Sequence, residues 1–123
     1  MTIIEAINKI DALKPNGYTQ SEKIAWLSTL DGMIKRSVID THEGGSEISF
    51  YGYDDETPLN TELIVKEPYD DLYILWLESK IDYANSEYVR YNNSITRYND
   101  VYWAFVREYN RNHMPRGTRI KYF

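Results

Sequence analysis

The chain has 123 residues, with 14 Lys and Arg against 19 Asp and Glu, a formal net charge of −5. This length suits one domain with a single hydrophobic core. The sequence has no cysteine, which excludes disulfides and thiolate metal sites within it. Residues 1–20 lack a signal-peptide pattern, and no apolar run reaches the roughly 18 residues of a membrane span. We therefore expect a soluble, acidic protein without general affinity for nucleic acid.

Charged side chains are unevenly distributed along the chain, and tyrosine is abundant. Residues 1–80 contain 7 basic and 15 acidic side chains, whereas residues 81–123 contain 7 basic and 4 acidic ones. Ten of the acids lie between Asp40 and Asp71, where Lys66 is the only base. This polarity would let copies attract one another head to tail, although a solvated loop and a basic terminus are the simpler interpretation. The 12 tyrosines are typical of a protein that buries surface against partners.

The first predicted helix follows Thr2, which has capping-box spacing to Glu5. Its apolar stripe is formed by Ile3, Ile7 and Ile10. The sequence Pro15-Asn16-Gly17 ends this helix, because proline cannot occupy a helix interior and Asn-Gly favours a turn.

A second helix is predicted from Thr19, which has the same spacing to Glu22, to about Asp40. One face carries Ile24, Leu27, Ile34 and Val38. We expect this face to pack against Ile7, Ile10 and the first turns after Pro68 in a shared core.

Residues 41–67, called the arm below, lose the helical period. Residues 48–51 and 62–65 resemble short strands separated by a polar turn at 54–58, which predicts a small β excursion at about 46–65. Such a hairpin is marginal alone, so we expect the arm to contact another subunit. The residues predicted to make this contact are Phe50, Tyr51, Tyr53, Leu63 and Val65.

A third helical segment is predicted to begin with Pro68 at the first helical position. From Ile74 to Tyr109, apolar and aromatic residues recur at alternating steps of three and four, a heptad pattern. The unbroken phase favours one long helix over 68–112, with weak points at 85–86 and 92–94, where a break would instead give an antiparallel pair. The predicted fold is mainly α: a helical bundle whose long C-terminal helix is bent or broken near 85–94.

The tail, residues 114–123, follows a helix stop at Met114-Pro115 and is basic and aromatic. We expect this end of the chain to dock on a partner, with an unconstrained tail as the alternative. The residues predicted to do so are Arg111, His113, Arg116, Arg119, Lys121, Tyr122 and Phe123.

No chemical motif stands out. His42 and His113 have no second ligand at metal spacing, and Gly44-Gly45 lacks the context of a phosphate loop. The acids at 54–56 lack the spacing of a calcium loop. We therefore expect no catalytic residue, no cofactor and no metal, and we do not expect an enzyme.

Several stretches together resemble the small head–tail connector (adaptor, or head-completion) proteins of tailed bacteriophages of Gram-positive hosts. The stretches are Lys14-Pro15-Asn16, Trp26-Leu27-Ser28-Thr29-Leu30-Asp31-Gly32, Thr57-Pro58-Leu59-Asn60-Thr61-Glu62-Leu63, Ile81-Asp82-Tyr83-Ala84-Asn85-Ser86-Glu87, Tyr91-Asn92-Asn93 and Tyr109-Asn110-Arg111-Asn112-His113-Met114-Pro115. The likeness is one of overall pattern over nearly the full chain. Ser86 stands where relatives would be expected to have glycine.

The resemblance implies a single helical connector domain, 1–123, that forms a twelve-fold ring beneath the portal and continues the DNA channel. The implied partners are copies of itself, the portal protein and a tail-completion or tail-terminator protein, with non-specific proximity to DNA and no membrane. The implied location is the head–tail neck of the virion, after synthesis in the bacterial cytoplasm. The family brings no catalytic residues; helix faces, an extended loop and the tail make its ring contacts. A helical DNA-binding or regulatory module using the basic C-terminus is the alternative, and an enzyme ranks last.

Overall fold

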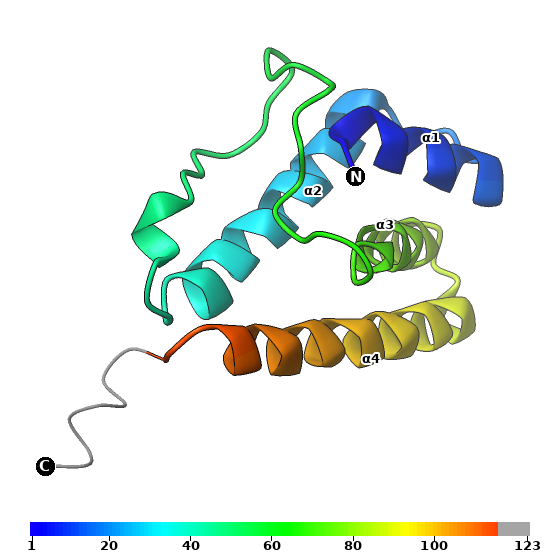
Figure 1. The fold of residues 1–123 in the computed structure, drawn as a ribbon. Coiled ribbons are helices and arrows are strands. Elements are labelled where there is room, and N and C mark those ends of the chain that lie inside the picture. The colour runs from blue at the N-terminus through cyan, green and yellow to red at the C-terminus, as the bar shows by residue number, and fades with distance from the viewer. Residues whose placement is uncertain (116–123) are drawn as a thin grey trace, which may run out of the picture.

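The computed structural model describes residues 1–115, whose four α-helices surround one core (Figure 1). α1 (Ile3–Leu13) is followed by α2 (Gln20–Ile34), which continues into a π-helical turn, η1 (Lys35–Ile39). A single 3₁₀ turn, η2 (Gly45–Glu47), lies in the arm. α3 (Asp71–Ala84) and α4 (Tyr88–Asn112) complete the bundle, with α4 below α3 in the view of Figure 1. The predicted mainly helical bundle with a long C-terminal helix is confirmed.

The two N-terminal helices begin where the sequence predicts. The Thr2 side chain accepts a hydrogen bond from the Glu5 amide, and the Glu5 side chain accepts one from the Thr2 amide, which completes a capping box. At α2 only half of that box forms, because Thr19 Oγ1 accepts from the Glu22 amide without a reciprocal bond. α2 and η1 together run to a cap at Asp40, as expected.

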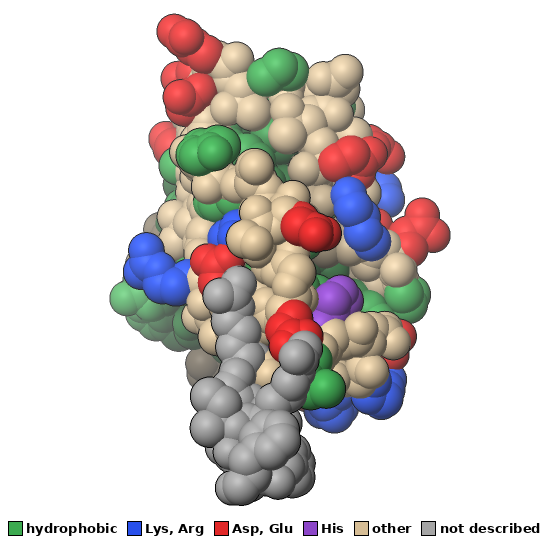
Figure 2. All heavy atoms as spheres, turned by 60° about the vertical axis from the view of Figure 1, so that its left-hand side comes forward, with side chains coloured by type: hydrophobic (Ala, Val, Ile, Leu, Met, Phe, Trp, Pro, Cys, Tyr) green, Lys and Arg blue, Asp and Glu red, His purple; other side chains and the backbone are tan. Residues whose placement is uncertain are grey.

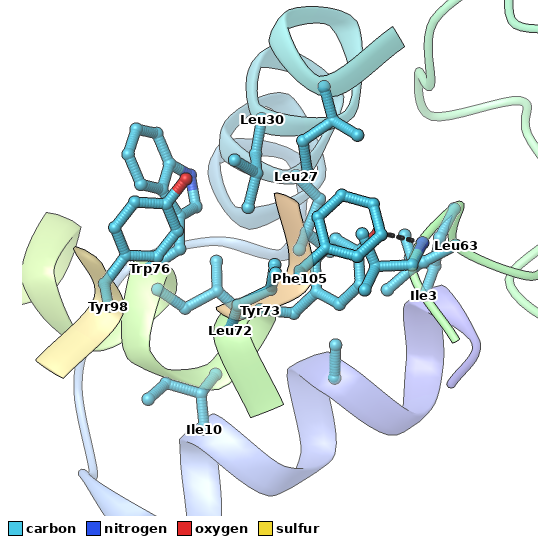
Figure 3. Packing of buried hydrophobic residues seen from close by; sticks show 14 of the residues in the cluster. Ile3, Ile10, Leu27, Leu30, Leu63, Leu72, Tyr73, Trp76, Tyr98 and Phe105 are labelled. Carbon is cyan, nitrogen blue, oxygen red and sulfur yellow. Dashed lines mark hydrogen bonds between the residues drawn. The ribbon is translucent and has the colours of Figure 1, made fainter. Parts of the chain in front are cut away.

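The core is formed by one face of each helix (Figure 3). The predicted face of α2 is buried in the same cluster as Ile7 and Ile10 of α1, which confirms the expected packing. In Figure 3, Leu30 of α2 points toward Leu72 of α3, and Leu27 and Tyr73 belong to the same buried cluster. This packing fixes the surface from which the arm leaves.

Of the two arrangements left open for residues 68–112, the favoured single helix is wrong, and the break at 85–86 that gives an antiparallel pair is found. α3 ends at Ala84 and α4 begins at Tyr88, and Ser86 between them has a left-handed φ of 61°. Ring contacts pair Trp76 with Tyr98 and Tyr69 with Phe105, so the two helices are antiparallel. The heptad seam thus folds back and packs largely against itself, although Ala84 and Tyr88 beside the turn stay exposed. A single straight helix of this length would leave more of the seam for other chains to cover.

Two further expectations for residues 46–71 are corrected. No strand ladder forms among residues 1–115, where the only bridges are the isolated pairs Thr2–Glu62 and His42–Pro115. Helix α3 starts at Asp71, because residues 66–72 instead form two successive turns around Pro68, which follows a cis peptide bond. The β-like alternation near 62–65 reflects burial against helices, as shown next.

Candidate assembly surface

One half of the arm, residues 52–65, is bonded to the helices through a buried carboxylate. Asp31 of α2 is fully buried and accepts three hydrogen bonds. Tyr53 Oη donates to Asp31 Oδ2 at 2.5 Å, and Tyr73 Oη of α3 donates to Asp31 Oδ1 at 2.6 Å. The backbone amide of Ile64 donates to Oδ2 at 3.1 Å. Asp31 therefore joins α2, α3 and two points of the arm.

The environment of Asp31 keeps the hydroxyl groups of Tyr53 and Tyr73 protonated. Burial raises the pKa of Asp31, and the hydrogen bonds from Tyr53, Tyr73 and Ile64 offset part of that rise because they favour the charged form. Burial and the adjacent Asp31 carboxylate raise the pKa of both tyrosines above the ordinary value of 10.0. Both phenols therefore remain protonated and able to donate at neutral pH. Tyr73 Oη also accepts from the Val65 amide at 2.8 Å.

Further bonds attach the same half of the arm to α1 and α2. The amides of Ile3 and Ile4 donate to the carbonyls of Thr61 and Leu59 at 3.1 and 2.9 Å. At the other end, the Tyr53 amide donates to Ser28 Oγ at 2.9 Å. Residues 52–65 are consequently part of the body of the domain.

The other half of the arm, residues 46–51, has almost no such bonds. Within residues 1–115, the backbone of Ser49 to Gly52 makes no hydrogen bond. The Phe50 ring packs edge-on against Tyr53 at 5.1 Å between centroids, while Tyr51 is 95% exposed and Ile48 is 37% exposed. This half therefore presents both backbone groups without hydrogen bonds in the described part of the chain and apolar side chains at the surface.

The predicted arm residues thus divide between the two halves. Leu63 and Val65 are 0% and 1% exposed and belong to the core of their own chain, and Tyr53 is held by Asp31. Of the five, Tyr51 stands at the surface and Phe50 is half-buried.

The C-terminal end of α4 carries the next predicted site residues. Arg111 is exposed and ion-paired with Glu108. The His113 ring stacks on Tyr109 with 3.8 Å between centroids. The predicted Arg116, Arg119, Lys121, Tyr122 and Phe123 lie outside the described residues.

Additional exposed aromatic residues lie on α3 and α4. Tyr83 is 60% exposed and contacts the rings of Tyr88 and Tyr91 beside the α3–α4 turn. Trp103, on the outer side of α4, is 54% exposed. The heptad pattern includes Tyr88 and Tyr91 but misses Tyr83 and Trp103, which are out of its phase. A large aromatic residue outside the heptad positions of a helix is the sequence signal that could have identified both residues.

Sequence reasoning also missed Asp31. The signal was present, because Asp31 falls within the apolar stripe of α2, between Leu27 and Ile34. A carboxylate at such a position must find donors inside the protein.

Figure 2 shows acidic side chains gathered at the upper end of the arm's face, the end at which the arm turns back in Figure 1. The arm sequence there is Asp54-Asp55-Glu56. Among residues 1–115, no group of His, Cys, Asp and Glu side chains is placed to hold a metal ion. None of the helices described is long and apolar enough to span a bilayer.

No protein-family model, no curated protein and no solved structure matches the chain.

Proposed function

We propose that the chain is a structural virion protein, a head–tail connector subunit. In this proposal, copies assemble into a ring of twelve between the portal and the tail of a bacteriophage and continue the DNA channel. The sequence resemblance motivates the proposal, and the helical bundle with its protruding arm is compatible with it.

The observation that carries the proposal is the surface of residues 46–51. The backbone of Ser49 to Gly52 makes no hydrogen bond inside residues 1–115, and the side chains of Ile48 and Tyr51 beside it are exposed, so this stretch is costly to leave as an open edge. Covering it with a neighbouring subunit supplies partners for both its backbone and its apolar side chains. The ten acids between Asp40 and Asp71 suit a protein that surrounds DNA without holding it, because like charges repel.

The test replaces only Ser46 to Tyr51 by a Gly/Ser linker of equal length. A longer replacement reaching residue 65 would remove Leu63 and Val65 from the core and confound assembly with folding. Wild-type protein, alone or with portal protein, should form rings of about twelve times the 14.6 kDa chain mass by electron microscopy and sedimentation. The linker variant should keep its helical circular dichroism and remain monomeric.

A matched control is Leu13→Ser, which removes an exposed apolar side chain of α1 far from the arm. It should leave ring size unchanged. A wild-type monomer or dimer that binds DNA with a steep salt dependence would instead support the regulatory, DNA-binding alternative. If the linker variant forms rings of normal size, the arm does not take part in assembly.

A further inference from the structure

A groove lies along the arm, and we call it the arm groove. It consists of two adjoining cavities of about 370 and 360 Å³ that share Ile48, Ile64 and Lys66 in their walls. The first cavity lies between residues 48–53 and 61–66, the two segments that the sequence predicted as paired strands. The second extends to the C-terminal end of α4, where His113 lines it. The groove thus separates two segments that form no ladder with each other.

The lining of the groove selects the chemistry of an occupant. Its walls include apolar side chains from four parts of the chain, namely Ile39, Leu63, Pro68 and Phe105. Its charged lining residues are Glu62, Glu67, Glu108 and Lys66. Glu62 is ion-paired with Lys66 at 3.6 Å and with the N-terminal ammonium at 3.3 Å, and Glu108 is ion-paired with Arg111, so among the described residues Glu67 is the lining acid without an ion pair. An occupant should therefore combine apolar side chains with positive charge.

The edge of the groove also offers backbone groups. Ser49 to Gly52 form no backbone hydrogen bond within residues 1–115, and Ile48 before them is extended, with φ −97° and ψ 109°. An extended peptide could bond to such an edge and place alternate side chains in the groove. The occupant that fits best is thus a short, basic and apolar segment in an extended conformation.

We propose that the arm groove binds residues 116–123 of a second copy of the chain. That segment carries Arg116, Arg119 and Lys121 and no acid, and its apolar residues Ile120 and Tyr122 alternate with basic ones. In a strand, this alternation turns Ile120 and Tyr122 to one side and Arg119 and Lys121 to the other. Eight residues reach about 26 Å beyond Pro115 when extended.

The residues just before this segment pair with the start of the arm of their own chain. The Glu43 amide donates to the Met114 carbonyl at 2.8 Å, and Pro115 forms an isolated antiparallel bridge with His42. Because groove and segment are different surfaces, each copy can accept one segment and donate another, and such a contact propagates until a ring closes. The inference rests on the proposed function in this respect, since the ring supplies the second copy.

The test uses the full chain and exploits its lack of cysteine. Chains with Ile48→Cys are mixed with chains with Tyr122→Cys under mild oxidation. Disulfide-linked dimers should form at least tenfold faster than in a mixture of Trp103→Cys with Tyr122→Cys, because Trp103 is exposed but lines neither cavity. If Ile48→Cys alters the circular dichroism spectrum, Ser49→Cys, which is exposed, replaces it.

A chain carrying both Ile48→Cys and Tyr122→Cys distinguishes the possible occupants. Linkage between copies gives a ladder of covalent oligomers, whereas an internally cross-linked monomer would overturn the second-copy assignment. Arg119→Glu with Lys121→Glu should lower the linkage rate at least tenfold at low salt; an unchanged rate would contradict the charge argument.

Assembly size, measured on the same samples, separates this inference from the proposed function. Normal rings without linkage at the groove would overturn the inference and leave the connector proposal standing. A ladder of short open oligomers without rings would support the groove assignment and contradict the connector proposal.

Discussion

The two halves of the arm share one loop but differ in what holds them. Residues 52–65 are bonded to α1, α2 and α3 through Asp31 and through backbone bonds to Ile3 and Ile4. Residues 46–51 contact the body through the ring of Phe50 and expose Tyr51 almost completely. A long loop in a small domain can therefore be structural over one part of its length and available for binding over the rest.

The largest expected difference comes from Leu63→Ala. Leu63 is fully buried in the core, so its truncation should lower the free energy of unfolding by about 2–5 kcal/mol. Leu27→Ala, on the predicted face of α2, should cost a similar amount for the same reason. Chemical denaturation followed by circular dichroism measures both. A loss below about 0.5 kcal/mol for Leu63→Ala would mean that the bonded half of the arm is not part of the body.

Asp31→Asn should cost about 1–3 kcal/mol, because the amide group places a donor where Tyr53, Tyr73 and Ile64 already donate. The cost should also depend on pH. Burial raises the pKa of folded Asp31 above its ordinary 3.8, so the folded state retains this proton to higher pH than the unfolded state. The wild-type advantage over Asp31→Asn should therefore be largest below pH 3.8 and decline as pH rises through the raised native pKa.

The control for this pH profile is Asp55→Asn, an exposed carboxylate at the turn of the arm. Its stability relative to wild type should vary little over the same range. An Asp31→Asn difference that is flat with pH would contradict the role given to burial.

Gly52→Ala tests the junction between the two halves. Gly52 has a φ of 89°, and a Cβ there would also lie 3.4 Å from Ser28 Oγ. We expect a loss of about 1–2 kcal/mol, since a left-handed conformation is unfavourable for alanine. Gly17→Ala is the matched control, because nothing lies within 4 Å of its added Cβ and its φ is not positive. Equal effects on the thermal midpoint would mean that the junction is not conformationally fixed.

Tyr51→Ala should have the smallest effect on stability, within about 0.5 kcal/mol, because the side chain is 95% exposed. Under the connector proposal the same substitution should reduce the fraction of protein in rings. Sedimentation velocity and thermal unfolding on one preparation compare the two effects. A large destabilisation would show that the open half of the arm also belongs to the body.

The sequence predicted the helices more accurately than their connections. Capping by Thr2 and Thr19 and the face of Ile24 and Leu27 are local signals, and each is found in the structure. The break at Ser86 was not resolvable by periodicity, because the seam keeps its phase whether the helix continues or folds back. Asn85-Ser86 marked only a weak point.

The candidate site was predicted only in part, for a different physical reason. Alternating Leu63 and Val65 give the same pattern in a paired strand as in an irregular segment buried against helices. Tyr51 could be named from its chemistry, but its exposure depends on the backbone conformation at the neighbouring Gly52, which has a φ of 89°. The groove is wholly tertiary, since its walls come from segments far apart in the sequence.

The antiparallel pairing of α3 with α4 also bears on the order of folding. The hydrogen bond from Ser94 to Asp82 joins residues 12 positions apart. The hydrogen bonds from Tyr53 and Tyr73 to Asp31 join residues 22 and 42 positions apart. Short-range contacts cost less loop entropy and generally form faster. We therefore expect the α3–α4 hairpin to nucleate quickly once it has emerged from the ribosome. α1 and α2, although made first, would then gain native protection against hydrogen exchange only after the C-terminal half is available to them.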